Sequence, residues 1–162
     1  MYVLGLDPGW SGGAAVLDFN GKVAAVQSFT GRTESDIISI IQGCLTIPPI
    51  PESRPVCYLE KVSAFPGQGV CSVFKFGMIY GLLRGLVIGE CRVIDVTPQK
   101  WQRALGCLTH GDKNISKAKA QMLFPGVKVT HGNADALLIA YYGYLQERGR
   151  VQGDMATWSA GK

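Results

Sequence analysis

The feature that limits the possible folds most strongly is the spacing of strand-length apolar segments along the chain. Three such segments follow one another near the N-terminus, at residues 2–7, 13–19 and 22–29, with only short connections between them. Asn20-Gly21, between the second and third segments, is typical of a tight hairpin whose two turn residues both take a positive φ. This region is therefore predicted to form an antiparallel three-stranded meander.

Two later strand segments, residues 56–62 and 91–96, each follow a segment with helical periodicity, at residues 33–45 and 71–89. A strand that is reached through a helix crosses over and runs parallel to an earlier strand. Thr33 or Ser35 is suited to cap the first of these helices. The predicted fold class is α/β, with a five-stranded mixed sheet in the order βββαβαβ and helices on its faces.

The part of the chain after residue 96 is predicted to be helical. Thr97 and Pro98 suit the cap and first position of a helix, and further helices are expected at residues 112–123 and from about 132 to 148. Residues 151–162 are polar and have no periodicity, which is typical of a frayed terminus. We therefore expect one domain over residues 1–150 and a flexible C-terminal tail over residues 151–162.

The cysteine content and the absence of targeting signals indicate a cytoplasmic protein. The five cysteines form no CxxC pair and are odd in number, so we expect reduced thiols in the core. No unbroken apolar run approaches the roughly 18 residues of a membrane span. No secretory signal precedes the first strand, which begins at residue 2.

The formal net charge of +4 originates in one segment of the chain. Between Thr97 and Lys119, Asp112 is the single acidic residue, and the basic residues are Lys100, Arg103, Lys113, Lys117 and Lys119. The rest of the chain is electrically balanced. Such a cluster is either a solvated helical surface or a surface that contacts a polyanion such as nucleic acid.

Two carboxylates end predicted strands that can be parallel neighbours. Asp7 directly follows the apolar first strand, and Glu60 lies near the end of VCYLEKV. Neighbouring strands lie about 4.8 Å apart, so the two groups would meet at the carboxyl edge of the sheet, where open α/β sheets bind ligands. Carboxylates this close repel each other unless one is protonated or a cation neutralises them, and a hard divalent metal is the simplest such cation.

His131 and Asp135 lie four residues apart at the start of the last predicted helix, and so share one of its faces. With Asp7 and Glu60 they could hold two metal ions about 3.5–4 Å apart, an arrangement that clamps a phosphodiester. Each residue also has a purely structural explanation. Asp135 could face the helix dipole, His131 could be an N-cap or a surface residue, Glu60 could lie at an exposed edge, and Asp7 could start a turn.

These residues lie in three motifs, LGLDPGWSGGAAVLD, YLEKV and HGNADALLIAYYG. In this order the motifs resemble the RuvC branch of the RNase H-like superfamily, over most of the chain from Tyr2 to about Arg148. The similarity is to phage-type, bacterial and chloroplast Holliday junction resolvases. Histidine at position 131 lies within the range of that family, where a carboxylate is more usual, and an imidazole ligand shifts the expected metal preference from Mg²⁺ toward Mn²⁺.

The resemblance implies an RNase H-like fold and a crossover junction endodeoxyribonuclease that resolves four-way DNA junctions as a homodimer. The expected reaction makes paired symmetric nicks that leave ligatable 5′-phosphate ends, with Mg²⁺ or Mn²⁺, two ions per active site, and no nucleotide cofactor or membrane. The metal ligands implied are Asp7, Glu60, His131 and Asp135, with Lys113 as a further catalytic residue. The DNA contacts implied are Phe65, Lys100, Arg103, Lys113, Lys117 and Lys119. A location in a bacterium, a phage-infected cell, or an organelle such as the chloroplast follows from the same resemblance.

Three features have two interpretations at this point. Gly77, Gly81, Gly85 and Gly89 recur every four residues in the helix predicted over 71–89, although glycine costs up to about 1 kcal/mol per helix position relative to alanine. This stripe either packs on the protein's own sheet or forms a dimer seam. Phe65, on a glycine-flanked turn, either fills the core or stacks on an unpaired base. Trp101 is expected to anchor the core rather than to bind DNA.

Three other functions remain open on the sequence. ATP-binding phosphotransferases of the actin and sugar-kinase type begin with a similar strand and hairpin, but they need two such domains to enclose a nucleotide. A branched-DNA-binding module without catalysis would result if His131 is not a ligand. A nuclease of the same fold could also act on another nucleic acid, such as an RNA–DNA hybrid.

Overall fold

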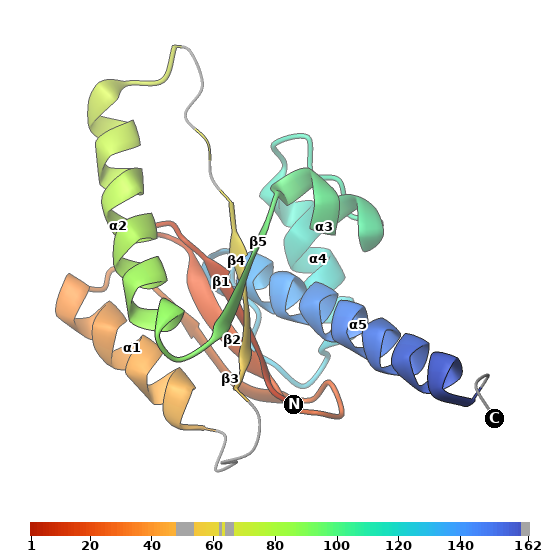
Figure 1. The fold of residues 1–162 in the computed structure, drawn as a ribbon. Helices are drawn as coiled ribbons and strands as arrows, with labels where there is room; N and C mark the ends of the chain where they lie inside the picture. The colour runs from red at the N-terminus through yellow and green to blue at the C-terminus, as the bar shows by residue number, and fades with distance from the viewer. Residues whose placement is uncertain (48–53, 62, 64–66, 160–162) are drawn as a thin grey trace.

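A five-stranded sheet with helices on both faces forms the centre of the molecule (Figure 1). The structure, a computed structural model, describes residues 1–47, 54–61, 63 and 67–159. The strands are β1 (Val3–Asp7), β2 (Gly13–Leu17), β3 (Val23–Ser28), β4 (Val56–Glu60) and β5 (Arg92–Val96), in the spatial order β3-β2-β1-β4-β5. β1 to β3 pair antiparallel, whereas β4 runs parallel to both β1 and β5. The predicted meander with two crossover strands is therefore confirmed.

The helices follow the predicted order along the chain. They are α1 (Glu34–Thr46), α2 (Val70–Ile88), α3 (Pro98–Ala104), α4 (Lys113–Leu123) and α5 (His131–Ser159). Thr33 caps α1, and the Asp36 side chain accepts a reciprocal bond from the Thr33 backbone N–H. α5 continues to Ser159, past its predicted end near residue 148. The division of the chain at residue 150 remains a prediction.

The turn between β2 and β3 differs from the predicted two-residue hairpin. Gly21 has a φ of +78°, but the expected positive φ at Asn20 is wrong, since among the described non-glycine residues only His110 has one. The Asp18 carboxylate accepts hydrogen bonds from the backbone N–H groups of Asn20 and Lys22 at 2.8 and 2.9 Å. The backbone N–H of Asp18 bonds to the Lys22 carbonyl. The loop is thus a three-residue turn closed by a left-handed glycine.

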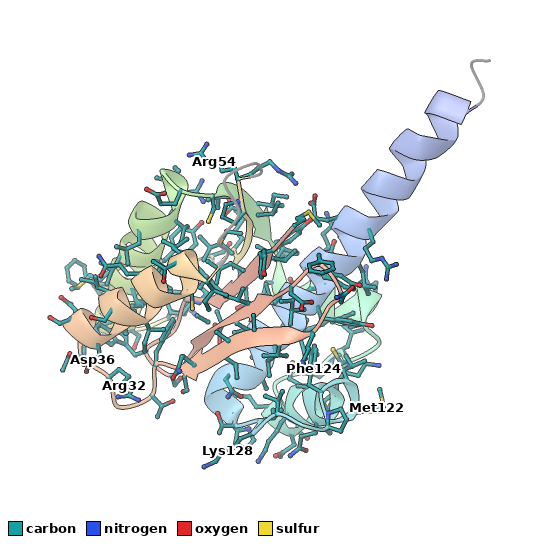
Figure 2. All side chains as sticks on the ribbon, turned by 90° about the horizontal axis from the view of Figure 1, so that it is seen from below. Arg32, Asp36, Arg54, Met122, Phe124 and Lys128 are labelled. Atoms are coloured by element: carbon teal, nitrogen blue, oxygen red, sulfur yellow. The ribbon has the colours of Figure 1, made fainter. Side chains whose placement is uncertain are left out.

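Alternate strand residues face two separate hydrophobic cores, one on each side of the sheet. Val3 belongs to the core beneath α3, α4 and α5, whereas Leu4 and Leu6 belong to the core beneath α1 and α2. Figure 2 shows side chains filling the space on both sides of the strands. The expected buried thiols are found at Cys44, Cys57, Cys91 and Cys107, all reduced, but Cys71 on α2 is exposed.

The backbone of α5 lies directly against β1 at Gly5. A Cβ at this position would overlap the Ala136 carbonyl oxygen and the Ala140 backbone nitrogen of α5. Glycine in a strand interior commonly marks such a close approach of another backbone. This contact holds the first turns of α5 beside the carboxyl end of β1.

α2 is the one helix, among those in the described part of the chain, that is long and apolar enough to cross a membrane by length and composition alone. This corrects the expectation that no segment reaches that size, which was based on unbroken apolar runs. Lys75 and Arg84 interrupt the runs within α2, and Arg84 pairs with Asp95 of β5 at 2.8 Å. Ile79 and Leu83 of α2 are buried in the core that α2 shares with α1.

Candidate active site at the carboxyl edge of the sheet

Asp7 and Glu60 end adjacent parallel strands, as predicted. Leu6 of β1 lies opposite Leu59 of β4, so the two acidic residues occupy the next position on each strand. β4 is an interior strand between β1 and β5, which contradicts the alternative that Glu60 lies at a sheet edge. The sheet register alone therefore brings two carboxylates to one place.

The surroundings of Asp7 and Glu60 disfavour the state in which both side chains are ionised. Burial raises the pKa of Asp7 to about 7, and the neighbouring Asp135 charge adds to the effect. Burial raises the pKa of Glu60 to about 8, again with a contribution from a nearby acid, here Asp7. Elevated pKa values at clustered buried acids are typical of sites that bind cations or transfer protons.

Asp135 brings a third carboxylate to the same cluster from α5. Burial raises its pKa, and the nearby hydroxyl of Ser116 on α4 opposes this rise. Ser116 Oγ and Asp135 Oδ1 are both buried, and neither has a hydrogen-bond partner of good geometry in the described part of the chain. A buried carboxylate oxygen without a partner is unfavourable unless a cation or water binds it.

Two positively charged or ionisable side chains lie within electrostatic reach of this cluster. Lys113, the first residue of α4, lowers the pKa of Asp7, Glu60 and Asp135 alike. His131, the first residue of α5, is exposed and lowers the pKa of Asp135. The structure therefore gathers all five residues that the sequence predicted for the catalytic centre.

The gathered residues do not form a preorganised four-ligand metal centre. Within the described ranges, no group of three or more His, Cys, Asp or Glu side chains is arranged to hold a metal ion. The donor set nevertheless fits a hard divalent cation, because it consists of clustered carboxylates and the buried Asp135 Oδ1 has no hydrogen-bond partner among the described residues. Mg²⁺ in particular uses one or two protein carboxylates and completes its shell with waters and substrate phosphates. The two-metal arrangement remains a prediction.

Trp101 contributes a contact that the sequence did not reveal. Its indole Nε1–H donates a 2.8 Å hydrogen bond to Glu60 Oε1. Trp101 is fully buried, so its predicted role as a core anchor is confirmed. The partner on Glu60 could not be found from the sequence, because 41 residues separate the two and no periodicity relates them.

The predicted DNA-contact residues differ in exposure. Lys100, Arg103 and Lys113 are exposed, and Lys117 and Lys119 are half-buried. Phe65 lies outside the described residues. The basic residues belong to α3 and α4, which precede α5 and its Asp135.

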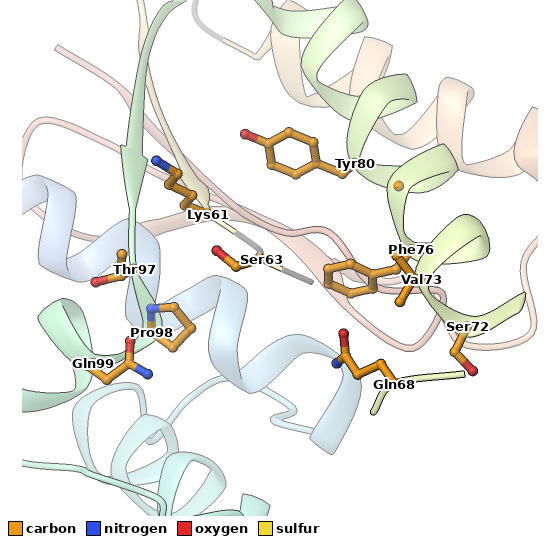
Figure 3. Close-up of a pocket in the computed structure, with 11 residues that line it drawn as sticks. Lys61, Ser63, Gln68, Ser72, Val73, Phe76, Tyr80, Thr97, Pro98 and Gln99 are labelled. Atoms are coloured by element: carbon orange, nitrogen blue, oxygen red, sulfur yellow. The ribbon is translucent and has the colours of Figure 1, made fainter. Parts of the chain in front are cut away.

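A cavity of about 540 Å³ lies between α2 and the segments that follow β4 and β5. Lys61, directly after Glu60, lines it together with Phe76 and Tyr80 of α2 and the segment Thr97 to Gln99 that follows β5. Figure 3 shows Phe76 and Tyr80 extending from α2 toward Ser63 and Lys61, with Pro98 and Gln99 on the other wall. The volume is in the range of small-ligand pockets.

Comparison with known proteins agrees with the predicted resemblance. The chain is 36% identical over 104 residues to "Holliday junction resolvase MOC1, chloroplastic" of Chlamydomonas reinhardtii, a match that covers 58% of this chain but only 12% of the relative. No protein-family profile matches the chain. The resemblance predicted from the three motifs is confirmed by this relative.

The fold is that of Thermus thermophilus RuvC. One structure of that protein superposes with a TM-score of 0.62 at 18% identity, and a second, in complex with a Holliday junction substrate, gives 0.63 at 16% identity. Each match covers 92% of this chain and 97% of the RuvC chain. The RNase H-like fold class predicted from the sequence is therefore confirmed.

Proposed function

We propose that the chain is a structure-specific endonuclease that resolves four-way DNA junctions by metal-dependent hydrolysis. The observation that carries the proposal is the convergence of Asp7, Glu60 and Asp135, three half-buried acids from β1, β4 and α5 with raised pKa values. The relative from Chlamydomonas is named a Holliday junction resolvase, and one RuvC structure of the same fold contains a junction substrate. These similarities supply the substrate class that the carboxylates alone do not specify.

The roles of the residues follow from their charges and positions. Asp7, Glu60 and Asp135, with His131 beside Asp135, would hold Mg²⁺ or Mn²⁺, two ions per site. Such ions, when bound, generate hydroxide from water near neutral pH and stabilise the leaving oxygen. Lys113 would face the scissile phosphate and offset the negative charge that builds up on it. The basic side chains of α3 and α4, Lys100, Arg103, Lys117 and Lys119, would contact flanking phosphates.

We further propose that two copies pair through α2. Large apolar side chains remain exposed along this helix, with exposed fractions of 84% at Val70, 67% at Phe74, 44% at Met78 and 55% at Ile88. A Cβ at Gly77, Gly81, Gly85 or Gly89 would meet nothing within 4 Å, so the alternative that this stripe packs on the protein's own sheet is wrong. Contiguous exposed apolar surface of this kind marks an interaction site.

A second copy fits this surface better than a membrane does. Paired nicks on opposed strands require two active sites related by symmetry, and an isologous contact through one helix supplies them. Arg84, one of the two charged residues of α2, forms an ion pair with Asp95 of β5, so this charge has a partner within the protein. The glycines would let the two α2 backbones approach closely.

The proposed cellular compartment is based on the relatives and not on the structure. The relative from Chlamydomonas is named chloroplastic, and RuvC is a bacterial protein. An organelle or a bacterial or phage-infected cytoplasm therefore suits the proposal equally.

Cleavage of a synthetic four-way junction tests the proposal directly. The full chain would be incubated with Mg²⁺ or Mn²⁺, and nicks would be mapped on all four strands. Paired nicks on opposed strands support both the activity and the dimer. Binding without cleavage in either metal would indicate a branched-DNA-binding module, and preferential cleavage of an RNA–DNA hybrid would indicate a different nuclease.

A further inference from the structure

The hydrogen bond between Trp101 and Glu60 joins the hydrophobic core to the acidic cluster. Trp101 Nε1 donates to Glu60 Oε1 at 2.8 Å, from α3 to the end of β4. The indole ring is fully buried in the core formed by α3, α4 and α5. Among the acids of the cluster in the described part of the chain, Glu60 is therefore the one whose carboxylate accepts a hydrogen bond from a fully buried core side chain.

The chemistry of this donor selects one arrangement of the carboxylate. An indole N–H can only donate, so the oxygen that it contacts must act as an acceptor. Oε1 is thus engaged, and Oε2 is left to bind another partner. Since interiors are close-packed, the ring cannot shift without disturbing its neighbours, and the direction of the bond is fixed with it.

We infer that Trp101 is a positioning residue that orients Glu60 so that Oε2 binds the divalent cation of the active site. The inference rests on the proposed metal-dependent function, but it concerns metal binding and not the nucleic-acid substrate. Partners in the outer shell of a metal site fix the orientation of a ligand and raise its affinity for the ion. A merely structural role would instead satisfy a buried indole N–H without any effect on metal affinity.

The first test uses Trp101 itself as the reporter. In a Trp10→Phe, Trp158→Phe background, Trp101 is the sole tryptophan of the chain. Mn²⁺ is paramagnetic and quenches indole fluorescence at short range, so we expect saturable quenching that excess Mg²⁺ reverses. Adding Glu60→Gln, whose amide oxygen still accepts the indole bond, should abolish the saturable part. Unchanged emission throughout a Mn²⁺ titration, with binding seen by calorimetry, contradicts the inference.

The second test removes only the donor. Trp101→Phe should weaken Mn²⁺ binding by about 10-fold or more, the usual effect of losing an outer-shell partner. Trp10→Phe is the matched control, because it also deletes an indole N–H donor, in this case one that bonds to the Lys75 carbonyl at 3.3 Å. Equal Mn²⁺ affinity in the two folded variants would overturn the positioning role. If Trp101→Phe does not fold, unchanged emission in the fluorescence test, which leaves the core native, still overturns the inference.

The outcomes separate this inference from the proposed function. If Mn²⁺ binds through Glu60 with an affinity that depends on Trp101, but the protein cleaves no junction, the inference stands and the proposed function is wrong. If the protein cleaves junctions, but the Trp101→Phe and Trp10→Phe variants bind Mn²⁺ equally well, the proposed function stands and the inference is wrong.

Discussion

The phenol of Tyr58 on β4 donates a 2.9 Å hydrogen bond to the carboxylate of Glu147 on α5. Glu147 is only 4% exposed, and its other oxygen accepts a 2.6 Å bond from Arg92 of β5. A buried carboxylate requires such partners, because an unpaired buried charge is strongly unfavourable. The contact fastens the middle part of α5 to the sheet.

Removing the Tyr58 hydroxyl should lower the stability of the folded protein without changing its fold. Tyr58→Phe is expected to lower the free energy of unfolding by about 1–3 kcal/mol, the usual effect of depriving a buried group of its partner. Tyr142→Phe is the matched control, since Tyr142 packs edge-on against the Tyr58 ring at 5.9 Å but does not bond to Glu147. Urea unfolding measures both, and equal losses in the two variants would contradict a specific role for the Tyr58 hydroxyl.

Stability of the metal-free protein should fall as the pH rises. The pKa of Asp7 rises from 3.8 to about 7 on folding, and that of Glu60 from 4.5 to about 8. The folded state therefore holds more protons than the unfolded state between those values, and the free energy of unfolding decreases through that window by on the order of a few kcal/mol.

Thermal unfolding in a chelator, near pH 5 and near pH 8, measures this effect. Mg²⁺ or Mn²⁺ should restore stability mainly at the higher pH, where the carboxylates are ionised. Asp7→Asn should flatten the dependence, because it removes one titrating group and relieves Glu60 of a neighbouring charge. A melting temperature that rises with pH in the chelated wild type would be the opposite sign and would exclude this account.

Alanine in the α2 stripe should separate helix stability from dimer formation. Gly77→Ala, Gly81→Ala and Gly85→Ala together should stabilise the monomer by up to about 1 kcal/mol per site, while they keep two copies apart and weaken the dimer. Gly43→Ala in α1 is the control, since a Cβ there also meets nothing within 4 Å. Sedimentation equilibrium compares the variants, and an unchanged dimer constant in the triple variant would place the interface elsewhere.

Asp7→Asn should abolish cleavage and leave junction binding largely intact. The change keeps the size of the side chain but removes the charge at the centre of the acidic cluster, so we expect the cleavage rate to fall at least about 100-fold. Band-shift titration in a chelator and single-turnover cleavage measure the two properties separately. Full cleavage by this variant would remove the assignment of Asp7 as a metal ligand.

Lys113 and Lys117 should affect different steps although they lie one turn apart on α4. Lys113 influences the pKa of three acids of the cluster, so Lys113→Ala should slow cleavage of bound junction. Lys117→Ala should instead weaken binding at all sequences and reduce the salt dependence by about one phosphate contact. Saturating single-turnover rates and salt titrations of binding distinguish the two, and interchangeable phenotypes would contradict the assignment.

The order of strands and the acidic cluster could be predicted because both depend on simple rules. Crossover connections are parallel, so Asp7 and Glu60 had to lie toward the same edge of the sheet if the helix between them formed, whereas the adjacency of their strands was an assumption that the structure confirms. The positions of His131 and Asp135 followed from helical spacing. These relationships need only the periodicity of each segment and the direction of each strand.

Contacts between side chains of separate elements could not be predicted in the same way. The bond from Trp101 to Glu60 and the bond from Tyr58 to Glu147 each join residues whose neighbourhood is set by packing rather than by spacing. The turn at Asn20 was also mispredicted, because the Asp18 side chain selects a different loop. The glycine stripe of α2 could be seen in the sequence, but only the open space around it separates the two interpretations.

The passage of α5 over Gly5 has a consequence for how the protein tolerates change. The backbones of β1 and α5 touch there with no side chain between them. The distance between Asp7 and Asp135 is therefore set by backbone geometry. Substitutions elsewhere in either core can alter size and shape without widening that gap. A larger residue at position 5 would instead push the α5 backbone away from β1, and Asp135 would move away from Asp7 with it.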